Sequence, residues 1–384
     1  MNRTRLNIKA LTFCLFFFFV GPSFLCSEPL YSPTWGFRLD LPEGYNYTEG
    51  NDIDRYSFEG PNRAKFDIAI YENSNGIEHL TADVYKRLDN TGDTALFKYN
   101  NKEAALFELN FMGMTGYGLC LELTSKVGEN KAPLMLALAY SPTGIQGMEY
   151  FHLSALNSIA PSQEEMHIPG PVMEFAYPRN QQINITVAGT NLNALIGIDD
   201  SLASQELVDR EFFVLSSYRF SQSWQEAWTR YYRMIYRDSA GRLSDPASKL
   251  LQHFDVNSID KSENGKRVFA EKVLAWVQGF TYERDFEGSD FVNLISAVSE
   301  GRGDCDSRAM LWAIILAYAD IPSAIMVSAD YSHAMGLADI KGEGARFESD
   351  GINWLVAETT AKVGLGLIDQ GMSDADSWLG IIFF

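Results

Sequence analysis

The sequence predicts an α+β protein with an N-terminal antiparallel sheet and flanking helices, a small β module and a helix-rich C-terminal domain. Three observations predict this arrangement. Apolar residues alternate with polar ones in short segments between Trp35 and Ile159, as in half-buried strands. The apolar period changes to that of helices at Ser223. The chain has 384 residues and is 46% hydrophobic, which is enough for two or three domains.

The net charge excludes two classes of partner. At a formal charge of −19, the chain lacks the basic surface by which proteins bind nucleic acids and anionic membranes. We therefore expect no nucleic-acid partner. No later segment approaches the ~20 apolar residues of a spanning helix, so we also expect no transmembrane anchor.

Residues 1–27 have the three parts of a secretory signal peptide. Basic residues at positions 3, 5 and 9 precede an apolar core from Ala10 to Val20, and a short tail follows. We expect cleavage after Ser27 and an exported protein, periplasmic or secreted. Cys26 leaves open the alternative of a lipid-modified, membrane-anchored lipoprotein.

Removal of the signal peptide leaves two of the four cysteines, Cys120 and Cys305. So few thiols in an exported protein provide no disulfide framework, and we expect both to be unpaired. Cys120 lies in a strand-like apolar run, where we expect it to pack in a core. Cys305 is not in such a strand-like run, so its presence needs an explanation other than packing in a sheet.

Residues 28–162 are predicted to form the first domain. Two helices, Ala82 to Leu88 and Met148 to Ile159, are placed to cover its sheet. Strands are predicted at residues 37–41, 66–70, 106–111, 119–123 and 134–140. The layout of residues 35–45, together with the helix that closes at Ile159, resembles the PsbP-type α/β/α domain. That resemblance implies a binding or scaffolding module.

A polar, proline-rich segment from Ala160 to Pro171 has the composition of an interdomain linker. Beyond it, residues 171–220 are predicted to be the small β module. Its strands are expected at Ile183–Val187, Leu195–Ile198 and Phe212–Phe220.

Residues 221–384 are predicted to form the third unit, which begins with helices. Ser223 and Glu226 have the spacing of a capping box, so a helix is expected to start there. A second start is expected at Ser244, and an amphipathic helix is expected from Gly265 to Val277.

Cys305 is expected at the start of a buried helix. Gly301 and Gly303 bracket Arg302 before it, and the apolar run from Ala309 to Ala319 allows about three helical turns. Unpaired backbone N–H groups and the positive end of the helix dipole favour a thiolate at such a position. We therefore expect Cys305 to be a nucleophile.

His333 and Glu358 lie in predicted strands that follow this helix, each on a side shared with apolar residues. An ionisable group on a buried face needs a partner. We expect the Glu358 carboxylate to orient His333, and His333 to accept the proton of Cys305. The remaining histidines are expected to be packed or solvent-facing: His79, His152, His167 and His253.

Three motifs in this region resemble those of the transglutaminase-like cysteine enzymes, which have a papain-like core. They are Gly-Asp-Cys-Asp-Ser-Arg at 303–308, Asp-Tyr-Ser-His-Ala-Met at 330–335 and Trp-Leu-Val-Ala-Glu-Thr-Thr at 354–360. The resemblance covers residues 225–384. It implies that Cys305 is the nucleophile, His333 the base and Glu358 the orienting acid, where the family more often has aspartate. By analogy with papain-like sites, Gln278 or Trp276 would join the Cys305 N–H in stabilising an oxyanion.

The resemblance implies an enzyme that acts on amide or peptide bonds through a thioester, by hydrolysis or amine transfer, without a cofactor or metal. Its substrate would be a protein or peptide, cell-wall peptides included. A metal site at Cys305 and His333 is disfavoured because no second cysteine or histidine stands at ligand spacing. The remaining alternative is a non-catalytic binding or scaffolding protein of the cell envelope.

Overall fold

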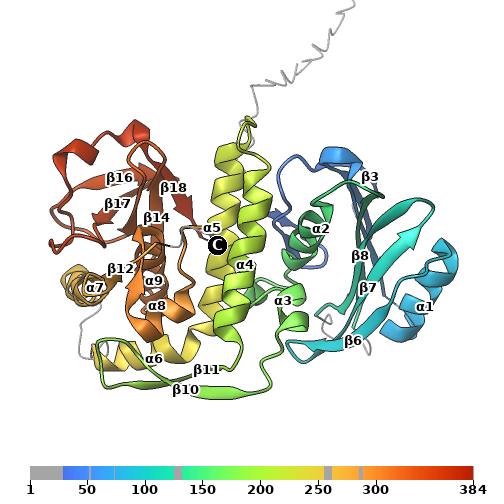
Figure 1. Cartoon of the computed structure of the whole chain (residues 1–384), viewed down its shortest axis with the longest axis horizontal. Coiled ribbons are helices and arrows are strands. Elements are labelled where there is room, and N and C mark those ends of the chain that lie inside the picture. Colours follow the sequence, from blue (N-terminus) through green and yellow to red (C-terminus); the bar gives the residue numbers. More distant parts are fainter. Residues whose placement is uncertain are drawn as a thin grey trace, which may run out of the picture.

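Two antiparallel sheets, one in each half of the chain, lie on either side of a central pair of long helices (Figure 1). These helices are α4 (Asp200–Ser216) and α5 (Trp224–Arg242). The computed structural model describes residues 29–51, 53–72, 74–124, 132–254, 262–284 and 289–383, so the expected signal peptide and Cys26 lie outside it. The predicted α+β class is confirmed. Within those residues, no helix has the length and apolarity needed to cross a lipid bilayer.

The N-terminal sheet has seven strands in the order β3-β4-β5-β9-β8-β7-β6, and every neighbouring pair is antiparallel. Burial alternates along β5, as the period-two pattern predicts. A separate antiparallel pair is formed by β1 (Leu30–Tyr31) and β2 (Arg38–Leu39). The seven strands are β3 (Asn46–Gly50), β4 (Arg55–Glu59), β5 (Lys65–Tyr71), β6 (Thr94–Tyr99), β7 (Lys102–Phe111), β8 (Met114–Glu122) and β9 (Leu134–Pro142).

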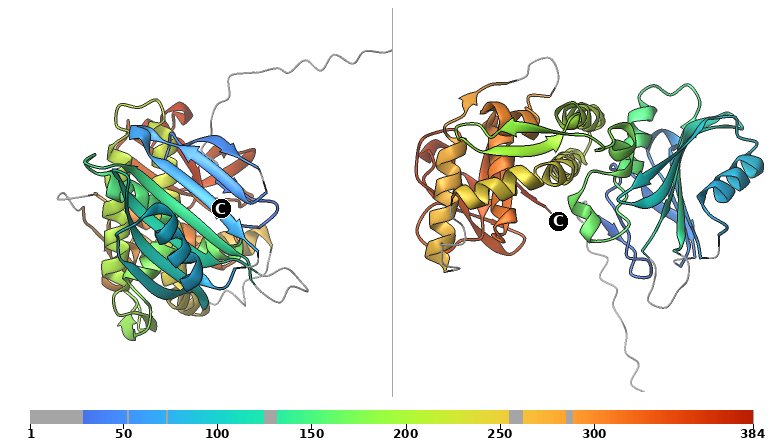
Figure 2. Two further views of the ribbon diagram at one scale, coloured as in Figure 1. Left: turned by 90° about the vertical axis from the view of Figure 1, so that its right-hand side faces the viewer. Right: turned by 90° about the horizontal axis from the view of Figure 1, so that it is seen from below.

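Helices cover both faces of this sheet, which explains why its central strands are apolar on both sides. On the outer face, α1 (Ile77–Leu88) packs against a cluster that contains Cys120, a core position as predicted. On the inner face, α2 (Met148–Asn157) and α3 (Pro171–Ala176) lie between the sheet and the central helices (Figures 1 and 2). We call the sheet with these three helices the N-terminal lobe.

The segment from Ala160 to Pro171 is not the exposed linker that its composition predicted. It contains a short 3₁₀ turn (Glu164–His167), and both Glu165 and Met166 are buried. Lys102 holds the Glu165 carboxylate at 2.9 Å. Helix α5 packs over the segment and supplies partners for its backbone, which explains why much of it is buried despite its polar composition.

Residues 171–220 contain the predicted hairpin but not the predicted third strand. The hairpin consists of β10 (Gln182–Thr186) and β11 (Asn193–Gly197). The expected strand at Phe212–Phe220 is wrong, because most of that segment belongs to α4. Buried positions along α4 recur every three or four residues, which is the helical period: Ala203, Leu207, Glu211 and Val214.

The predicted helix starts at Ser223 and Ser244 are confirmed. Helix α5 begins after Ser223, although that side chain accepts no hydrogen bond from the described helix backbone, so the capping box does not form. The other helices of this half are α6 (Ser244–His253), α7 (Glu263–Val277), α8 (Leu294–Glu300) and α9 (Cys305–Tyr318).

The C-terminal sheet has five strands in the order β16-β17-β15-β14-β18, all antiparallel. Helix α9 lies against one face, where Gly336 allows close approach: a Cβ there would be 2.5 Å from the Trp312 ring. We call this sheet with α5 to α9 the C-terminal lobe. Its strands are β14 (Ser323–Ser328), β15 (His333–Ala338), β16 (Arg346–Ser349), β17 (Ile352–Ala357) and β18 (Leu379–Ile382), and a short parallel pair lies beside α8, β12 (Thr281–Tyr282) with β13 (Arg302–Gly303).

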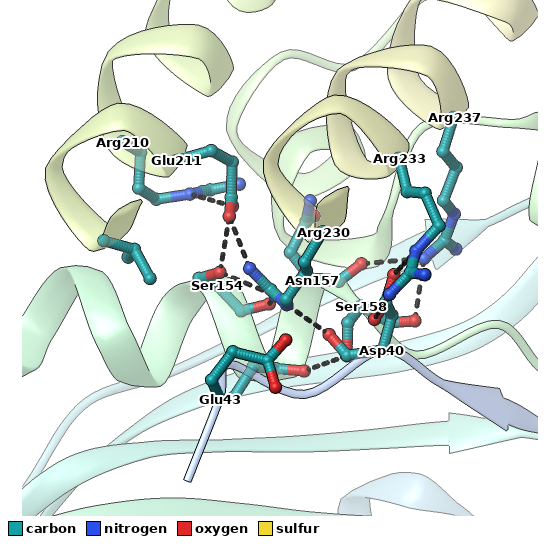
Figure 3. Close-up of polar contacts among 12 residues, drawn as sticks. Asp40, Glu43, Ser154, Asn157, Ser158, Arg210, Glu211, Arg230, Arg233 and Arg237 are labelled. Carbon is teal, nitrogen blue, oxygen red and sulfur yellow. Dashed lines mark hydrogen bonds and ion pairs between the residues drawn. The ribbon is translucent and has the colours of Figure 1, made fainter. Parts of the chain in front are cut away.

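Arginines on one side of α5 join the two lobes (Figure 3). Arg230, Arg233 and Arg237 are three and four residues apart, so they share a helix face. Arg230 donates to the Glu211 carboxylate at 2.8 Å. Arg233 donates to both oxygens of Asp40, each at 2.9 Å. Paired in this way, the guanidinium groups are stably buried at the boundary between the lobes.

Arg237 binds backbone carbonyls instead of a carboxylate. Its guanidinium donates to the carbonyl oxygens of Asn157, Ser158 and Ile159 at 3.0, 2.9 and 2.8 Å. Asn157 is the last residue of α2, Ser158 is its C-cap and Ile159 follows; carbonyls at a helix C-terminus lack partners within the helix and carry partial negative charge. Arg237 therefore caps α2 from a different lobe.

Candidate active site

The loop before Cys305 fixes the start of α9. Gly301 has a φ of +67°, which glycine adopts without strain, and ends α8. Asp304 is the N-cap, and its Oδ1 accepts hydrogen bonds from the Ser307 N–H at 2.8 Å and the Ser307 hydroxyl at 2.5 Å. Arg308 donates to the Phe280 carbonyl at 2.8 Å. Asp304 and Arg308 thus cap and brace the helix.

Cys305 is the first residue of α9, as expected, and is only 3% exposed. Its thiol accepts a hydrogen bond from the backbone N–H of Ala334, the second residue of β15. That contact seats the thiol at the beginning of the strand on which His333 stands. Neither Cys305 nor Cys120 forms a disulfide with another described residue.

His333 and Glu358 are in direct contact: His333 Nε2 and Glu358 Oε2 are 2.8 Å apart. The second carboxylate oxygen, Oε1, accepts from the Thr360 N–H at 2.7 Å, the Thr360 hydroxyl at 2.6 Å and the Ala361 N–H at 3.3 Å. Burial alone would raise the pKa of Glu358, but the hydrogen bonds from His333 and Thr360 outweigh it and lower this pKa to about 2. An ionised acceptor favours the Nε2–H tautomer of His333, which leaves Nδ1 with a lone pair.

The expected thiolate at Cys305 is contradicted by its surroundings. Burial, followed by the nearby carboxyls of Asp306 and Asp304, raises the pKa of the Cys305 thiol to about 12, against the Ala334 N–H and the charge of Arg284. Burial also raises the pKa of Asp306, to about 6. Desolvation and two adjacent acidic groups therefore outweigh the effects that would favour a thiolate at this position. Cys305 is therefore a neutral thiol at rest.

The two side chains expected as oxyanion donors have other partners. Both hydrogen bonds of the Gln278 Nε2 go to backbone carbonyls, of Glu358 at 2.8 Å and Val363 at 2.9 Å. Trp276 Nε1 donates to the Ala188 carbonyl at 2.9 Å. The expectation is wrong because the N–H groups of both side chains already donate to backbone carbonyls. Gln278 instead positions the acid, by holding the backbone of Glu358.

Two aromatic side chains near the site were not singled out from the sequence. The Trp378 ring stands edge-on to His333, with ring centroids 6.3 Å apart, and its Nε1 donates to the Met372 carbonyl at 2.9 Å. The buried Tyr232 hydroxyl hydrogen-bonds the carboxyl of Asp306. Tyr232 lies beside Trp228 and Tyr231 on α5, and this aromatic cluster could have indicated it, whereas no motif marks Trp378.

The described residues contain no group of three or more histidine, cysteine, aspartate or glutamate side chains arranged to hold a metal ion. The groups described here are a buried thiol and an imidazole that a carboxylate orients, which are the groups that thiol-based acyl transfer uses.

Comparison with known proteins adds no family. No family model matches the chain, and no curated protein matches it. Four chains of known structure match it, among them a crystal structure from Bacteroides thetaiotaomicron VPI-5482. That structure is 13% identical, with a TM-score of 0.25, over 57% of this chain and 79% of the other. A likeness of this size supports no conclusion about fold or function.

Proposed function

We propose that this chain is an exported cysteine enzyme of the transglutaminase-like type, with a papain-like core, that acts on amide or peptide bonds. Cys305 is the nucleophile, His333 the general base and Glu358 the acid that orients it. The observation that carries the proposal is the 2.8 Å contact between His333 Nε2 and Glu358 beside a thiol held by the Ala334 N–H.

In the first half-reaction, Cys305 Sγ attacks the carbonyl carbon of the amide while its proton moves to Nδ1 of His333. The C–S bond forms, and the carbonyl oxygen takes up negative charge near the Cys305 backbone N–H. The C–N bond then breaks, and the leaving amine takes the proton from Nδ1. The products are a thioester on Cys305 and a free amine.

In the second half-reaction, water or an amine attacks the thioester carbonyl and passes its proton to Nδ1 of His333. The C–S bond breaks, and that proton returns to the sulfur. Water yields a carboxylic acid by hydrolysis, whereas an amine yields a new amide by transfer. Proteins or peptides, including cell-wall peptides, are the substrates that an exported enzyme of this type would meet.

The raised pKa of Cys305 determines how the first step proceeds. A thiol with a pKa of about 12 carries almost no thiolate at neutral pH. We therefore propose that proton transfer to His333 accompanies the attack on the carbonyl. The ionised Glu358 stabilises the imidazolium that forms during this step.

The test is labelling of the mature protein by a peptide-like electrophilic probe, read by intact mass and peptide mapping. We expect label on Cys305, and no label there in Cys305→Ala or His333→Ala. Cys120→Ala is the matched control, because it removes the other buried thiol and should leave labelling unchanged. Label that persists on Cys305 in His333→Ala at the wild-type rate would remove His333 from the mechanism.

A second candidate, a non-catalytic binding or scaffolding protein of the cell envelope, is favoured by the burial of Cys305. At 3% exposure and with a raised pKa, this thiol also fits a purely structural role. The same experiment separates the two. Equal and slow labelling of Cys305 and Cys120 in the folded protein would favour the binding protein.

A further inference from the structure

We propose that the Tyr282 hydroxyl is a second donor to the oxyanion that forms when Cys305 attacks a substrate carbonyl. This inference rests on the proposed function. It assigns a role that Gln278 and Trp276 do not fill, because their N–H groups already donate to backbone carbonyls. Two donors share the charge of the oxyanion in well-described acyl-transfer sites, and the Cys305 N–H supplies only one.

Strand pairing places Tyr282 next to the start of α9. Strand β12 runs parallel to β13, and Tyr282 pairs with Gly303, two residues before Cys305. The Thr281 N–H donates to the Gly301 carbonyl at 2.7 Å. The backbone that carries Tyr282 is therefore fixed to the loop that presents the thiol.

Two arginines hold the Tyr282 side chain. The Arg308 guanidinium, on the first turn of α9, lies over the ring at 5.4 Å from its centroid. Arg284 Nε donates to the Tyr282 hydroxyl oxygen at 3.1 Å. The same guanidinium reaches the carbonyl of Ser332, the residue before His333, at 3.4 Å. These contacts place the hydroxyl between the first turn of α9 and the start of β15.

The Tyr282 hydroxyl is free to donate and open to a substrate. The residue is 49% exposed. Its oxygen accepts from Arg284, and its hydrogen has no acceptor among the residues that the structure describes. Partial desolvation, followed by the nearby Cys305 sulfur, raises the pKa of Tyr282 against the hydrogen bond from Arg284, so the hydroxyl stays protonated at neutral pH. A hydroxyl that accepts from a cation is polarised and donates more strongly.

Tyr282 donates a hydrogen bond in this step and keeps its proton. As the C–S bond forms, an electron pair of the C=O bond moves to the oxygen, and the thiol proton moves to Nδ1 of His333. The Cys305 N–H and the Tyr282 O–H both donate to that oxygen. Because these bonds strengthen as negative charge develops, they lower the barrier to attack without changing the reactivity of the thiol itself.

The test compares two reagents on Cys305 in the mature full-length protein. Iodoacetamide alkylates the thiol by displacing iodide at a saturated carbon, so no oxyanion forms. N-acetylglycinal adds the thiol S–H across its C=O bond, and the oxygen of the resulting hemithioacetal lies where the oxyanion would lie. This aldehyde is small enough to make no demand on side-chain pockets.

Peptide mapping by mass spectrometry measures the alkylation rate of Cys305, and protection by increasing amounts of aldehyde gives the Kd of the aldehyde. N-acetylglycinol, which has no carbonyl group, is the matched reagent control. In the wild type we expect saturable protection by the aldehyde and none by the alcohol.

Tyr282→Phe removes the hydroxyl and keeps the ring against Arg308. We expect it to raise the Kd of the aldehyde at least about tenfold, since loss of one oxyanion donor in a protease costs about 10²–10³ in rate. Its alkylation rate should stay within about twofold of the wild type, because that rate follows the thiolate fraction. Tyr331→Phe is the matched control and should behave as the wild type, because the Tyr331 ring packs with Trp378 on the sheet face away from α9.

The outcomes that would overturn the proposal differ in what else they remove. An unchanged Kd in Tyr282→Phe would assign the oxyanion to other groups and leave the roles of the cysteine, histidine and acid intact. Equal losses of aldehyde affinity and alkylation rate would show that Tyr282 only shapes the loop. Absence of saturable protection in the wild type, or equal protection by the alcohol, would overturn this inference together with the proposed function.

Discussion

Replacement of Arg237 by leucine should destabilise the whole protein, because this guanidinium caps a helix of the opposite lobe. Arg237 is 1% exposed and donates to three carbonyls at the end of α2 and just after it. It also reaches the Ile168 carbonyl at 3.2 Å and the Glu165 carbonyl at 3.4 Å. Leucine fills most of the volume but leaves these acceptors buried without a donor.

The expected loss is about 3–5 kcal/mol, because a hydrogen bond to a charged group contributes about 1.5–3 kcal/mol and this guanidinium makes several of them. The leucine variant would lose a charged donor that several carbonyl oxygens share. Each carbonyl costs about 1–3 kcal/mol of stability when it is buried and unpaired, and water that enters the site would recover part of this cost. Arg237→Lys should lose less, since an ammonium group retains three donors and the charge.

The assay is unfolding in guanidinium chloride, followed by circular dichroism and by tryptophan fluorescence. Arg219→Leu is the matched control, because Arg219 is exposed at the end of α4 and should change stability by less than about 0.5 kcal/mol. Thermolysin should spare residues 160–171 in the wild type and cut them in Arg237→Leu. A leucine variant within about 1 kcal/mol of the wild type would refute the capping argument.

Three further predictions concern the candidate active site. Alkylation of Cys305 by iodoacetamide should keep accelerating up to pH 10, because its pKa is raised to about 12, and a plateau below pH 8 would contradict this. Asp306→Asn removes a negative charge beside the thiol, so labelling of Cys305 at pH 8 should rise about tenfold, and an unchanged rate would show that the Asp306 carboxyl does not raise this pKa. The folded pKa of Glu358 lies below its unfolded value, so its contribution to stability is present above about pH 4.5 and is lost as pH falls toward 2. Acid unfolding of Glu358→Gln should therefore depend less on pH over that window, and identical pH dependence would contradict the pairing with His333.

The pairing of His333 with Glu358 could be predicted because strand alternation is a local property of sequence. A polar residue in register with apolar neighbours lies on a buried face, and two such groups on nearby strands need each other. The start of α9 at Cys305 could be predicted for the same reason, because neighbouring glycines, an N-cap residue and an apolar run mark it in the sequence.

Contacts between distant segments could not be predicted in the same way. The polar composition of residues 160–171 indicated a linker, but Arg237 arrives from far along the chain to bury its carbonyls. Gln278 was expected to face the thiol, and its partners are carbonyls that only the folded chain brings near. The pKa of Cys305 depends on desolvation, which a sequence does not reveal.

The strand expected at Phe212–Phe220 was wrong for a different reason. Its aromatic and β-branched residues favour a strand locally, but they continue a helical period that begins at the start of α4. A longer window would have distinguished the two, since period 3.6 becomes evident only over several turns.

The two sides of α5 bind different partners, and this restricts where recombination could join this chain to another protein. One side carries guanidinium groups matched to acceptors of the N-terminal lobe, while Tyr232 meets Asp306 beside the thiol. Transplanting the C-terminal lobe alone onto another protein would leave those cations facing an unrelated surface. A functional fusion or a natural recombinant must therefore carry both lobes together, and breakpoints that give soluble chimaeras should fall outside residues 30–383.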